Sequence, residues 1–380
     1  MNNETRKETQ VLPKDVRYVG ADDLTLPLFE NQYPVQPMGV SYNSYLILDE
    51  KVAVMDSVDA RAADEWLAKL AHELDGRSPD YLVISHMEPD HSGSILRLAE
   101  RYPEMQLVGN TKTFAMLRQF FGASAPANER LVEVGEGGTL PLGAHTLHFM
   151  LAPMVHWPEV MVAYEETEKL LFSADAFGRF GSLGRTANAP WAPQARRYYY
   201  NIVGKYGAQV QALLKKAAAL EIETICPLHG PVLTGGALAE ALRLYDLWSR
   251  WQSEAPEEIL LAHASIHGNT ARAAELLKQK LEAKGARVTL CDLTTTEVSY
   301  AVANAFYCGK LVLACSTYDG GLFPPMEEFL THLQAKGFRS RTVGLIENGS
   351  WAPAAARLMR AKLEEMKDLR VCGTVVSLRS

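Results

Sequence analysis

The feature that most constrains this chain is a run of metal-ligand side chains placed directly after an apolar strand pattern. Residues 85–93 read Ser-His-Met-Glu-Pro-Asp-His-Ser-Gly and follow the apolar run YLVI. The ligand-type side chains of this run are His86, Glu88, Asp90 and His91. Pro89 excludes the interior of a helix, because proline lacks the N–H that the helix ladder needs. We expect a loop that turns all four side chains toward one point.

Three further ligand candidates also stand where an apolar strand pattern ends. His156 follows the run TLHFMLA, Asp175 follows LLF, and His229 follows TIC. Open α/β sheets place their ligands at the carboxyl ends of strands, so these loops are expected to converge with the 85–93 loop.

The combined set contains four imidazoles and three carboxylates and no thiolate. Seven ligands are too many for one tetrahedral zinc ion, but they suit two ions with three terminal ligands each and one bridging carboxylate. Nitrogen and oxygen ligands with open coordination positions are typical of non-haem iron that binds dioxygen. A single histidine is more often an ordinary core or surface residue, so the prediction depends on the cluster.

The pattern of the chain changes near residue 255. The polar segment SEAPEE predicts a linker, and it is followed by the strand EILLAHAS and a helix over 269–284. Strands and helices then alternate to the end, which predicts a doubly wound parallel sheet. The earlier part has strands both paired and separated by helices, which leaves α/β and α+β layered folds open. We therefore predict two domains, 1–253 and 257–380.

Three polar loops follow strands of this second part. The first, from Ser265 to Thr270, has a glycine and opens a helix, so backbone N–H groups can hold a phosphate without Lys or Arg. It matches neither the nucleoside-triphosphate P-loop nor the GxGxxG motif. By itself, this loop is equally well explained as an ordinary helix cap. The loops 316–321 and 348–351 add small residues and the aromatic rings of Tyr318 and Trp351, which can stack on a flavin or simply pack.

The motifs together resemble one family. The metallo-β-lactamase superfamily usually has His-x-His-x-Asp-His, and the form here, His-x-Glu-x-Asp-His, resembles the flavodiiron proteins (A-type flavoproteins). Sixty-four residues between His91 and His156 and eighteen between His156 and Asp175 are similar to the family's spacings. The flanks PMVHWPE, FSADAFG and CPLHGP and the later segments GLFPPMEEFL and ENGSWAPAAA extend the resemblance over nearly the whole chain.

This resemblance implies a fold and a set of site residues. The fold is a metallo-β-lactamase-like αββα sandwich followed by a flavodoxin-like doubly wound sheet, which here lacks its last helix because the chain stops at VCGTVVSLRS. His86, Glu88 and His156 would hold one iron, and Asp90, His91 and His229 the other, with Asp175 as the bridge. The implied FMN contacts are Ser265, His267, Gly268, Asn269, Thr270, Ser316, Thr317, Tyr318, Asp319, Gly320, Asn348, Gly349, Ser350 and Trp351. His267 departs from the family, which often has Tyr there.

The resemblance also implies an activity and partners. Reducing dioxygen to two waters takes four electrons, two from a diferrous centre and two from reduced FMN, and reducing two nitric oxides to nitrous oxide takes two. A rubredoxin-like donor and a head-to-tail homodimer, or a dimer of such dimers, are implied. The alternatives are a binuclear zinc hydrolase with an appended flavodoxin-like domain, and a flavoprotein electron carrier with a vestigial metal site. Glu88 disfavours the hydrolase, which usually has a third imidazole in that loop.

The composition of the chain indicates which partners and which cellular compartment to expect. Lys and Arg number 38 and Asp and Glu 45, so the net charge of -7 gives no reason to expect nucleic acid or an anionic membrane as partner. No apolar run approaches a transmembrane length, and MNNETRKETQ has no signal-peptide core. Five cysteines without a CxxC argue against a disulfide scaffold. We therefore expect a cytoplasmic protein.

Overall fold

The computed structural model describes residues 12–379, and the chain divides into two compact units. The first unit runs to Tyr199 and resumes over Ala208–Arg243, and the second holds Tyr200–Gly207 and Leu244–Ser380. Helix α8 (Gly235–Ser249) carries the chain from the first unit into the second. Among the described residues, none of the helices has the length and apolar character needed to cross a bilayer.

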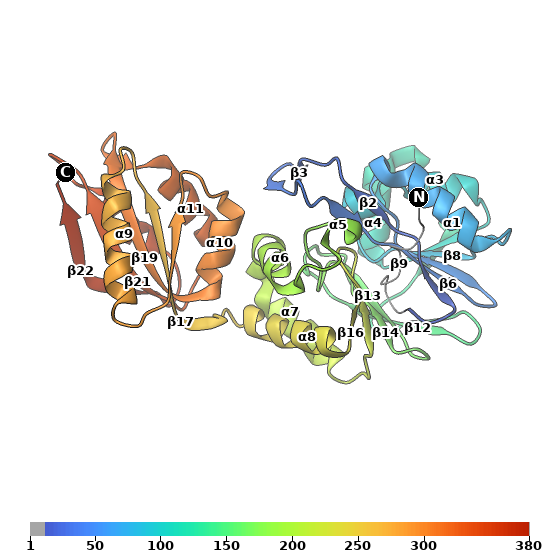
Figure 1. Ribbon diagram of the computed structural model, residues 1–380. Helices are drawn as coiled ribbons and strands as arrows, with labels where there is room; N and C mark the ends of the chain where they lie inside the picture. Colours follow the sequence, from blue (N-terminus) through green and yellow to red (C-terminus); the bar gives the residue numbers. More distant parts are fainter. Residues whose placement is uncertain (1–11, 380) are drawn as a thin grey trace, which may run out of the picture. The chain divides into compact units, whose positions relative to one another are not determined.

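The first sheet of the first unit is mostly parallel. Its strands, in spatial order, are β1 (Val16–Tyr18), β6 (Tyr45–Leu48), β7 (Val52–Met55), β8 (Tyr81–Val83), β9 (Gln106–Gly109) and β10 (Leu131–Glu133). The pairs β1–β6 and β6–β7 are antiparallel, and the others are parallel. Parallel neighbours need crossover connections, and helices α1 (Ala63–Leu74), α3 (Ile95–Arg101) and α4 (Thr111–Phe121) lie in them (Figure 1).

The second sheet is mostly antiparallel. Its strands are β11 (Thr139–Pro141), β12 (Thr146–Leu151), β13 (Met161–Glu165), β14 (Leu170–Phe172), β15 (Thr224–Cys226) and β16 (Leu233–Thr234). The one parallel pair is β14–β15. Between these two strands the chain makes α5 (Leu183–Thr186), α6 (Trp191–Tyr198) and α7 (Gly207–Ala217). Two short ladders complete the unit: β2 (Ala21–Asp23) with β5 (Val40–Tyr42), and β3 (Leu28–Phe29) with β4 (Tyr33–Pro34).

The two sheets share one hydrophobic core. Ile47, Met55 and Val83 of the first sheet belong to the same buried cluster as Phe149 and Phe172 of the second. The sheets therefore face each other, and the helices are left for the outer faces, as in an αββα sandwich. The predicted fold of this part is confirmed.

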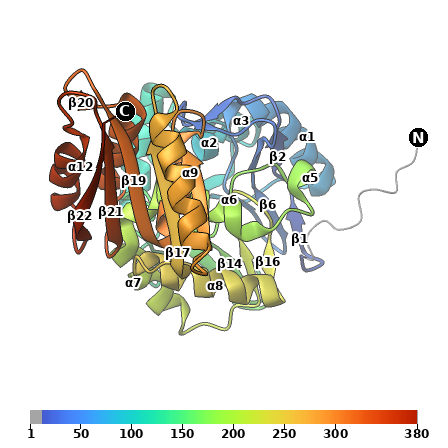
Figure 2. The ribbon, with the colours of Figure 1, turned by 60° about the vertical axis from the view of Figure 1, so that its left-hand side comes forward.

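The second unit is built on a parallel sheet. Its strand order is β18 (Val288–Asp292), β17 (Ala255–Ala264), β19 (Cys308–Tyr318), β21 (Thr342–Asn348) and β22 (Arg370–Leu378), with β20 (Gly321–Leu322) paired to β19. This is the flavodoxin-like order. Right-handed crossovers place α9 (Asn269–Glu282) on one face, where Figure 2 shows it in front of the strands. The other face receives α10 (Val298–Tyr307), α11 (Pro324–Ala335) and α12 (Ala355–Glu364).

The end of the predicted linker is strand rather than loop. Strand β17 begins at Ala255, which pairs with Cys308, and the register shifts between Ala255 and Ile259. Pro256 lies in this irregularity, because proline has no N–H to give to a regular ladder. The domain boundary at 253–257 stays a prediction. Strand β22 is the last element that the structure describes.

Candidate metal centre

The structure brings all seven predicted ligand side chains together. The 85–93 loop leaves β8, and Pro89 is the first residue of the single turn α2 (Pro89–Ser92). Of the other three ligand residues, His156 lies in the loop after β12, Asp175 follows the end of β14, and His229 follows the end of β15. Their ligand atoms form two groups, each within 4.8 Å: His86, Glu88, His156 and Asp175, and Asp90, His91 and His229.

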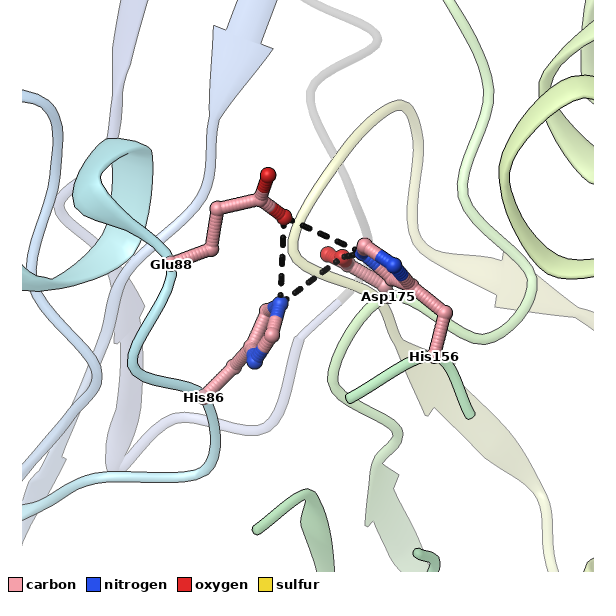
Figure 3. Close-up of side chains that lie close together, drawn as sticks. All are labelled: His86, Glu88, His156 and Asp175. Atoms are coloured by element: carbon pink, nitrogen blue, oxygen red, sulfur yellow. Dashed lines mark hydrogen bonds and ion pairs between the residues drawn. The ribbon is translucent and has the colours of Figure 1, made fainter. Parts of the chain in front are cut away.

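In the first group, two imidazoles face two carboxylates (Figure 3). His86 Nε2 lies 3.2 Å from Glu88 Oε2 and 3.4 Å from Asp175 Oδ2. His156 Nε2 lies 3.1 Å and 3.0 Å from the same two oxygens. Four ligand atoms from three separate loops therefore surround one point.

Asp175 links the second group to the first. The other carboxylate oxygen of Asp175, Oδ1, lies 3.2 Å from His91 Nε2 and 3.6 Å from His229 Nε2. Asp90 Oδ2 lies 3.3 Å and 3.2 Å from the same two nitrogens, which are 3.0 Å apart. One oxygen of Asp175 faces each group, which is the geometry of a bridging carboxylate.

The spacing of these atoms fits two metal ions. Metal–ligand bonds of about 2.0–2.2 Å separate neighbouring ligands of one ion by roughly 3.0–3.5 Å. Within the described residues, both oxygens of Asp90 and Oδ1 of Asp175 are buried and accept no hydrogen bond. Buried anionic oxygens without donors are costly unless a cation binds them. The site therefore has the donors, the spacing and the buried negative charge that a binuclear centre needs.

The electrostatics of the site favour cations. Burial disfavours a charged His86, but Asp175 and Glu159 outweigh it and raise the pKa of His86 well above its usual value. Burial likewise opposes charge on His156, and its hydrogen bonds with Asp175 and Glu88 raise the pKa of His156 to about 9. The metal-free cluster thus binds protons where metal ions would otherwise balance its carboxylates.

Sequence reasoning missed the residues that orient these ligands. Asp56, in the left-handed conformation (φ 57°) after β7, accepts the Ser85 N–H at 2.7 Å and so holds the start of the ligand loop. His229 Nδ1–H donates to the Ser41 carbonyl at 2.7 Å. Asn43 Nδ2 donates to the carbonyls of residues 227 and 230 at 2.8 Å each, on either side of His229. Asp56 stands at a strand exit, so the rule that found the ligands would have found it too.

Aromatic rings line the same site and were also missed. Trp157 packs edge-on against His86, with ring centroids 5.3 Å apart. Phe29 and Tyr198 contact His229 at 5.3 Å and 5.6 Å. Such walls lower the local dielectric constant and strengthen the electrostatic interactions inside.

The three predicted flavin loops leave the carboxyl ends of β17, β19 and β21 in the second unit. The Thr270 hydroxyl lies 2.8 Å from Ser316 Oγ and accepts from Asn348 Nδ2 at 3.2 Å, so one side chain of each loop meets there. Gly268 has a φ of 89° and precedes α9, whose first turn lacks a side-chain cap among the described residues. Free N–H groups at a helix start suit a phosphate.

The other predicted flavin residues belong to the same three loops. Thr317 Oγ1 accepts the N–H of Ala354 at 2.9 Å and so ties its loop to the segment before α12. Tyr318 is 44% and Trp351 90% exposed, so neither ring is part of the core. His267 and Asn269 of the first loop and Asp319, Gly320 and Ser350 of the other two loops are also exposed, and Ser265 and Gly349 are half-buried. The flavin contacts stay predictions.

Comparison with known proteins gives a consistent picture. The model of the ODP family beta lactamase matches residues 40–230. The anaerobic nitric oxide reductase flavorubredoxin of Vibrio vulnificus is 27% identical over 92% of this chain and 72% of its own length. The rubredoxin-oxygen oxidoreductase of Megalodesulfovibrio gigas is 28% identical over 92% of this chain and 87% of its own.

One relative is much longer, and one solved structure is close in fold. A putative diflavin flavoprotein A 2 of Synechocystis is 27% identical over 86% of this chain, but the chain spans only 56% of that protein. The flavodiiron protein from Giardia intestinalis superimposes with a TM-score of 0.86 at 25% identity, over 96% of this chain and 92% of that one.

Proposed function

This chain belongs to the ODP family beta lactamases, and from that premise we propose that it is a flavodiiron oxidoreductase that reduces dioxygen to water, nitric oxide to nitrous oxide, or both. The observation that carries the proposal is the pair of ligand groups joined by the two oxygens of Asp175. The names of relatives as flavorubredoxin and rubredoxin-oxygen oxidoreductase support the same class of reaction.

The residues divide between two iron positions. His86, Glu88 and His156 would hold one ion and Asp90, His91 and His229 the other, with Asp175 between them. Bound iron supplies electrons and open coordination positions for a diatomic gas. The side chains of Glu88, Asp90 and His156 are 13%, 11% and 8% exposed, whereas the other ligands are at most 1% exposed. Substrate therefore enters on the side of Glu88, Asp90 and His156.

FMN is the second cofactor that the relatives imply. The start of α9 would receive its phosphate, and the loops that carry Tyr318 and Trp351 would hold its ring system. The protein supplies placement and electrostatics, and FMN relays electrons. Dioxygen reduction uses four electrons, which reduced FMN and two ferrous ions provide together.

The proposed partners follow from the same relatives. Two of them carry rubredoxin in their names, which supports a rubredoxin-like donor for this chain. A head-to-tail homodimer would place the flavin of one subunit near the irons of the other, and two-fold dimers are the commonest assembly. A cytoplasmic location completes the proposal.

The test is anaerobic reduction of protein loaded with iron and FMN, followed by mixing with dioxygen or nitric oxide and measurement of gas consumption. We expect turnover with at least one gas and none with the same protein loaded with zinc, which is the matched control. A binuclear zinc hydrolase is the rival, and Glu88 in place of a third imidazole disfavours it. Protein that takes up only zinc, or that is inert to both gases when fully reduced, contradicts the proposal.

A further inference from the structure

A carboxylate outside the ligand set lies behind His86. Glu159, in the loop before β13, is 1% exposed. Its Oε1 accepts the His86 Nδ1–H at 2.7 Å and the backbone N–H of Met87 at 2.9 Å. The Glu159 carbonyl accepts from Asn110 Nδ2 at 2.6 Å, and Asn110 also caps α4. Both the carboxylate and the backbone carbonyl of Glu159 are therefore fixed by hydrogen bonds.

This contact determines how His86 presents itself to the ligand cluster. Because the Nδ1–H of His86 is directed at Glu159, the proton that a metal ion displaces is the one on Nε2, which faces Glu88 Oε2 and Asp175 Oδ2 at 3.2 Å and 3.4 Å. A carboxylate behind a metal-binding imidazole also makes that imidazole a stronger donor.

The two imidazoles of the second group, His91 and His229, lack this support within the described residues. The outer nitrogen of His229 meets only the neutral carbonyl of Ser41, at 2.7 Å. The outer nitrogen of His91 is buried and has no hydrogen-bond partner within residues 12–379. The two metal positions are thus supported unequally: an anion accepts a hydrogen bond from the outer nitrogen of His86, whereas among the described residues the outer nitrogens of His91 and His229 have no hydrogen bond to an anion.

We propose that Glu159 is a positioning residue that makes the His86, Glu88 and His156 position the tighter of the two metal sites. The inference rests on the two-metal centre of the proposed function. Glu159 touches no metal and no substrate; it acts by fixing the tautomer and the direction of the His86 ring. Loss of such support typically weakens metal binding by about 10–100-fold.

The chain offers a matched control. His145 Nδ1 and Glu165 Oε1 form a second buried pair at 3.0 Å, and neither residue belongs to the ligand groups. Glu165→Gln therefore reports what the same substitution does to a buried pair elsewhere in the fold. Glu159→Gln keeps an oxygen that can accept from His86 but removes the charge, and Glu159→Asp keeps the charge on a shorter arm.

The experiment measures metal affinity by titrating the metal-free full chain with Co²⁺ under anaerobic conditions, against a competing chelator, with absorbance and metal analysis as readouts. We expect two unequal affinities in the wild type. Glu159→Gln should weaken the tighter one 10–100-fold and leave the other within about threefold. Glu165→Gln should leave both unchanged, and Glu159→Asp should fall between the wild type and Glu159→Gln.

Ligand variants assign the affected position. In a His229→Gln background, which disables the second position, Glu159→Gln should still weaken the remaining ion. In a His156→Gln background, which disables the first, it should have no effect. Equal weakening in both backgrounds, or unchanged affinities in folded Glu159→Gln, overturns the role of Glu159. A wild type that binds fewer than two ions refutes the proposed two-metal centre itself, so the two failures are distinguishable.

Discussion

Removing the metal should reverse the pH dependence of stability in the first unit. In the metal-free protein, burial opposes a charged His156, but its hydrogen bonds with Asp175 and Glu88 raise its pKa to about 9. The unfolded value is about 6.5. A group whose pKa is raised on folding stabilises the protein fully below the unfolded value, and that stabilisation is lost as the pH rises through the folded value. The free energy of unfolding of the metal-free protein should therefore fall between pH 6.5 and 9.

The size of the effect follows from the same two values. A rise from about 6.5 to about 9, at about 1.4 kcal/mol for each tenfold change in proton affinity, corresponds to about 3 kcal/mol. Burial opposes charge on Glu88 and Asp175, but the same ion pairs lower the pKa values of both carboxyl groups. Because the two sets of shifts describe one interaction, its free energy is counted only once. For a unit of this size, 1 kcal/mol moves the melting temperature by about 2–4 °C, which gives a fall of about 6–12 °C.

The assay is thermal unfolding followed by circular dichroism, at several pH values from 6 to 9, with and without metal. His156→Gln is the control, because it removes one titrating group and should make the pH dependence of the metal-free form shallower, while His86, whose charge burial opposes but whose pKa Asp175 and Glu159 raise, still contributes. The loaded protein should show the opposite trend, since protons compete with metal for the imidazoles at low pH. Metal-free wild type whose melting temperature rises over this range, or matches the slope of His156→Gln, would refute the reasoning.

Three further substitutions test other parts of the molecule. Asp175→Asn should reduce bound metal from two ions per chain to one or none, measured by metal analysis, because a neutral amide bridges two cations poorly; retention of both ions would argue against the bridge. Asn43→Ala leaves the carbonyls of residues 227 and 230 without their donor and should cost about 1–3 kcal/mol in the free energy of unfolding, measured by urea titration; an unchanged midpoint would contradict this. Trp351→Ala should leave the melting temperature within about 1–2 °C, because the ring is 90% exposed, and should weaken FMN binding measured by fluorescence quenching; equal FMN affinity would exclude a stacking role.

Much of the site could be predicted from the sequence because its donors are local to strand exits. His86, Glu88, Asp90 and His91 follow one strand, and Asp175 directly follows another. The residues that follow the carboxyl ends of neighbouring parallel strands lie on the same side of a sheet. A residue's position just after a strand therefore already indicates that it lies near the site. The alternation of strands and helices after residue 255 predicted the parallel sheet in the same way.

Glu159 shows what this reasoning does not reach. It stands only three residues after His156, yet its carboxylate serves His86, seventy-three residues away. Nothing in the local pattern distinguishes a glutamate that binds metal from one that orients a ligand. The same holds for Ser41, whose contribution is a backbone carbonyl that any residue type has.

The sequence by itself determined which donors exist and that they collect at strand ends, since strand periodicity and side-chain chemistry are local properties. The division of the donors between two ions was already implied by the resemblance to a known family. Only the tertiary structure decided which oxygen of Asp175 faces which group and which imidazole has an anion behind it. Those outcomes depend on pairing between strands far apart in the chain, such as β14 with β15, and on the packing of one sheet against the other. Contacts of that range are set by the free energy of the whole fold rather than by any segment.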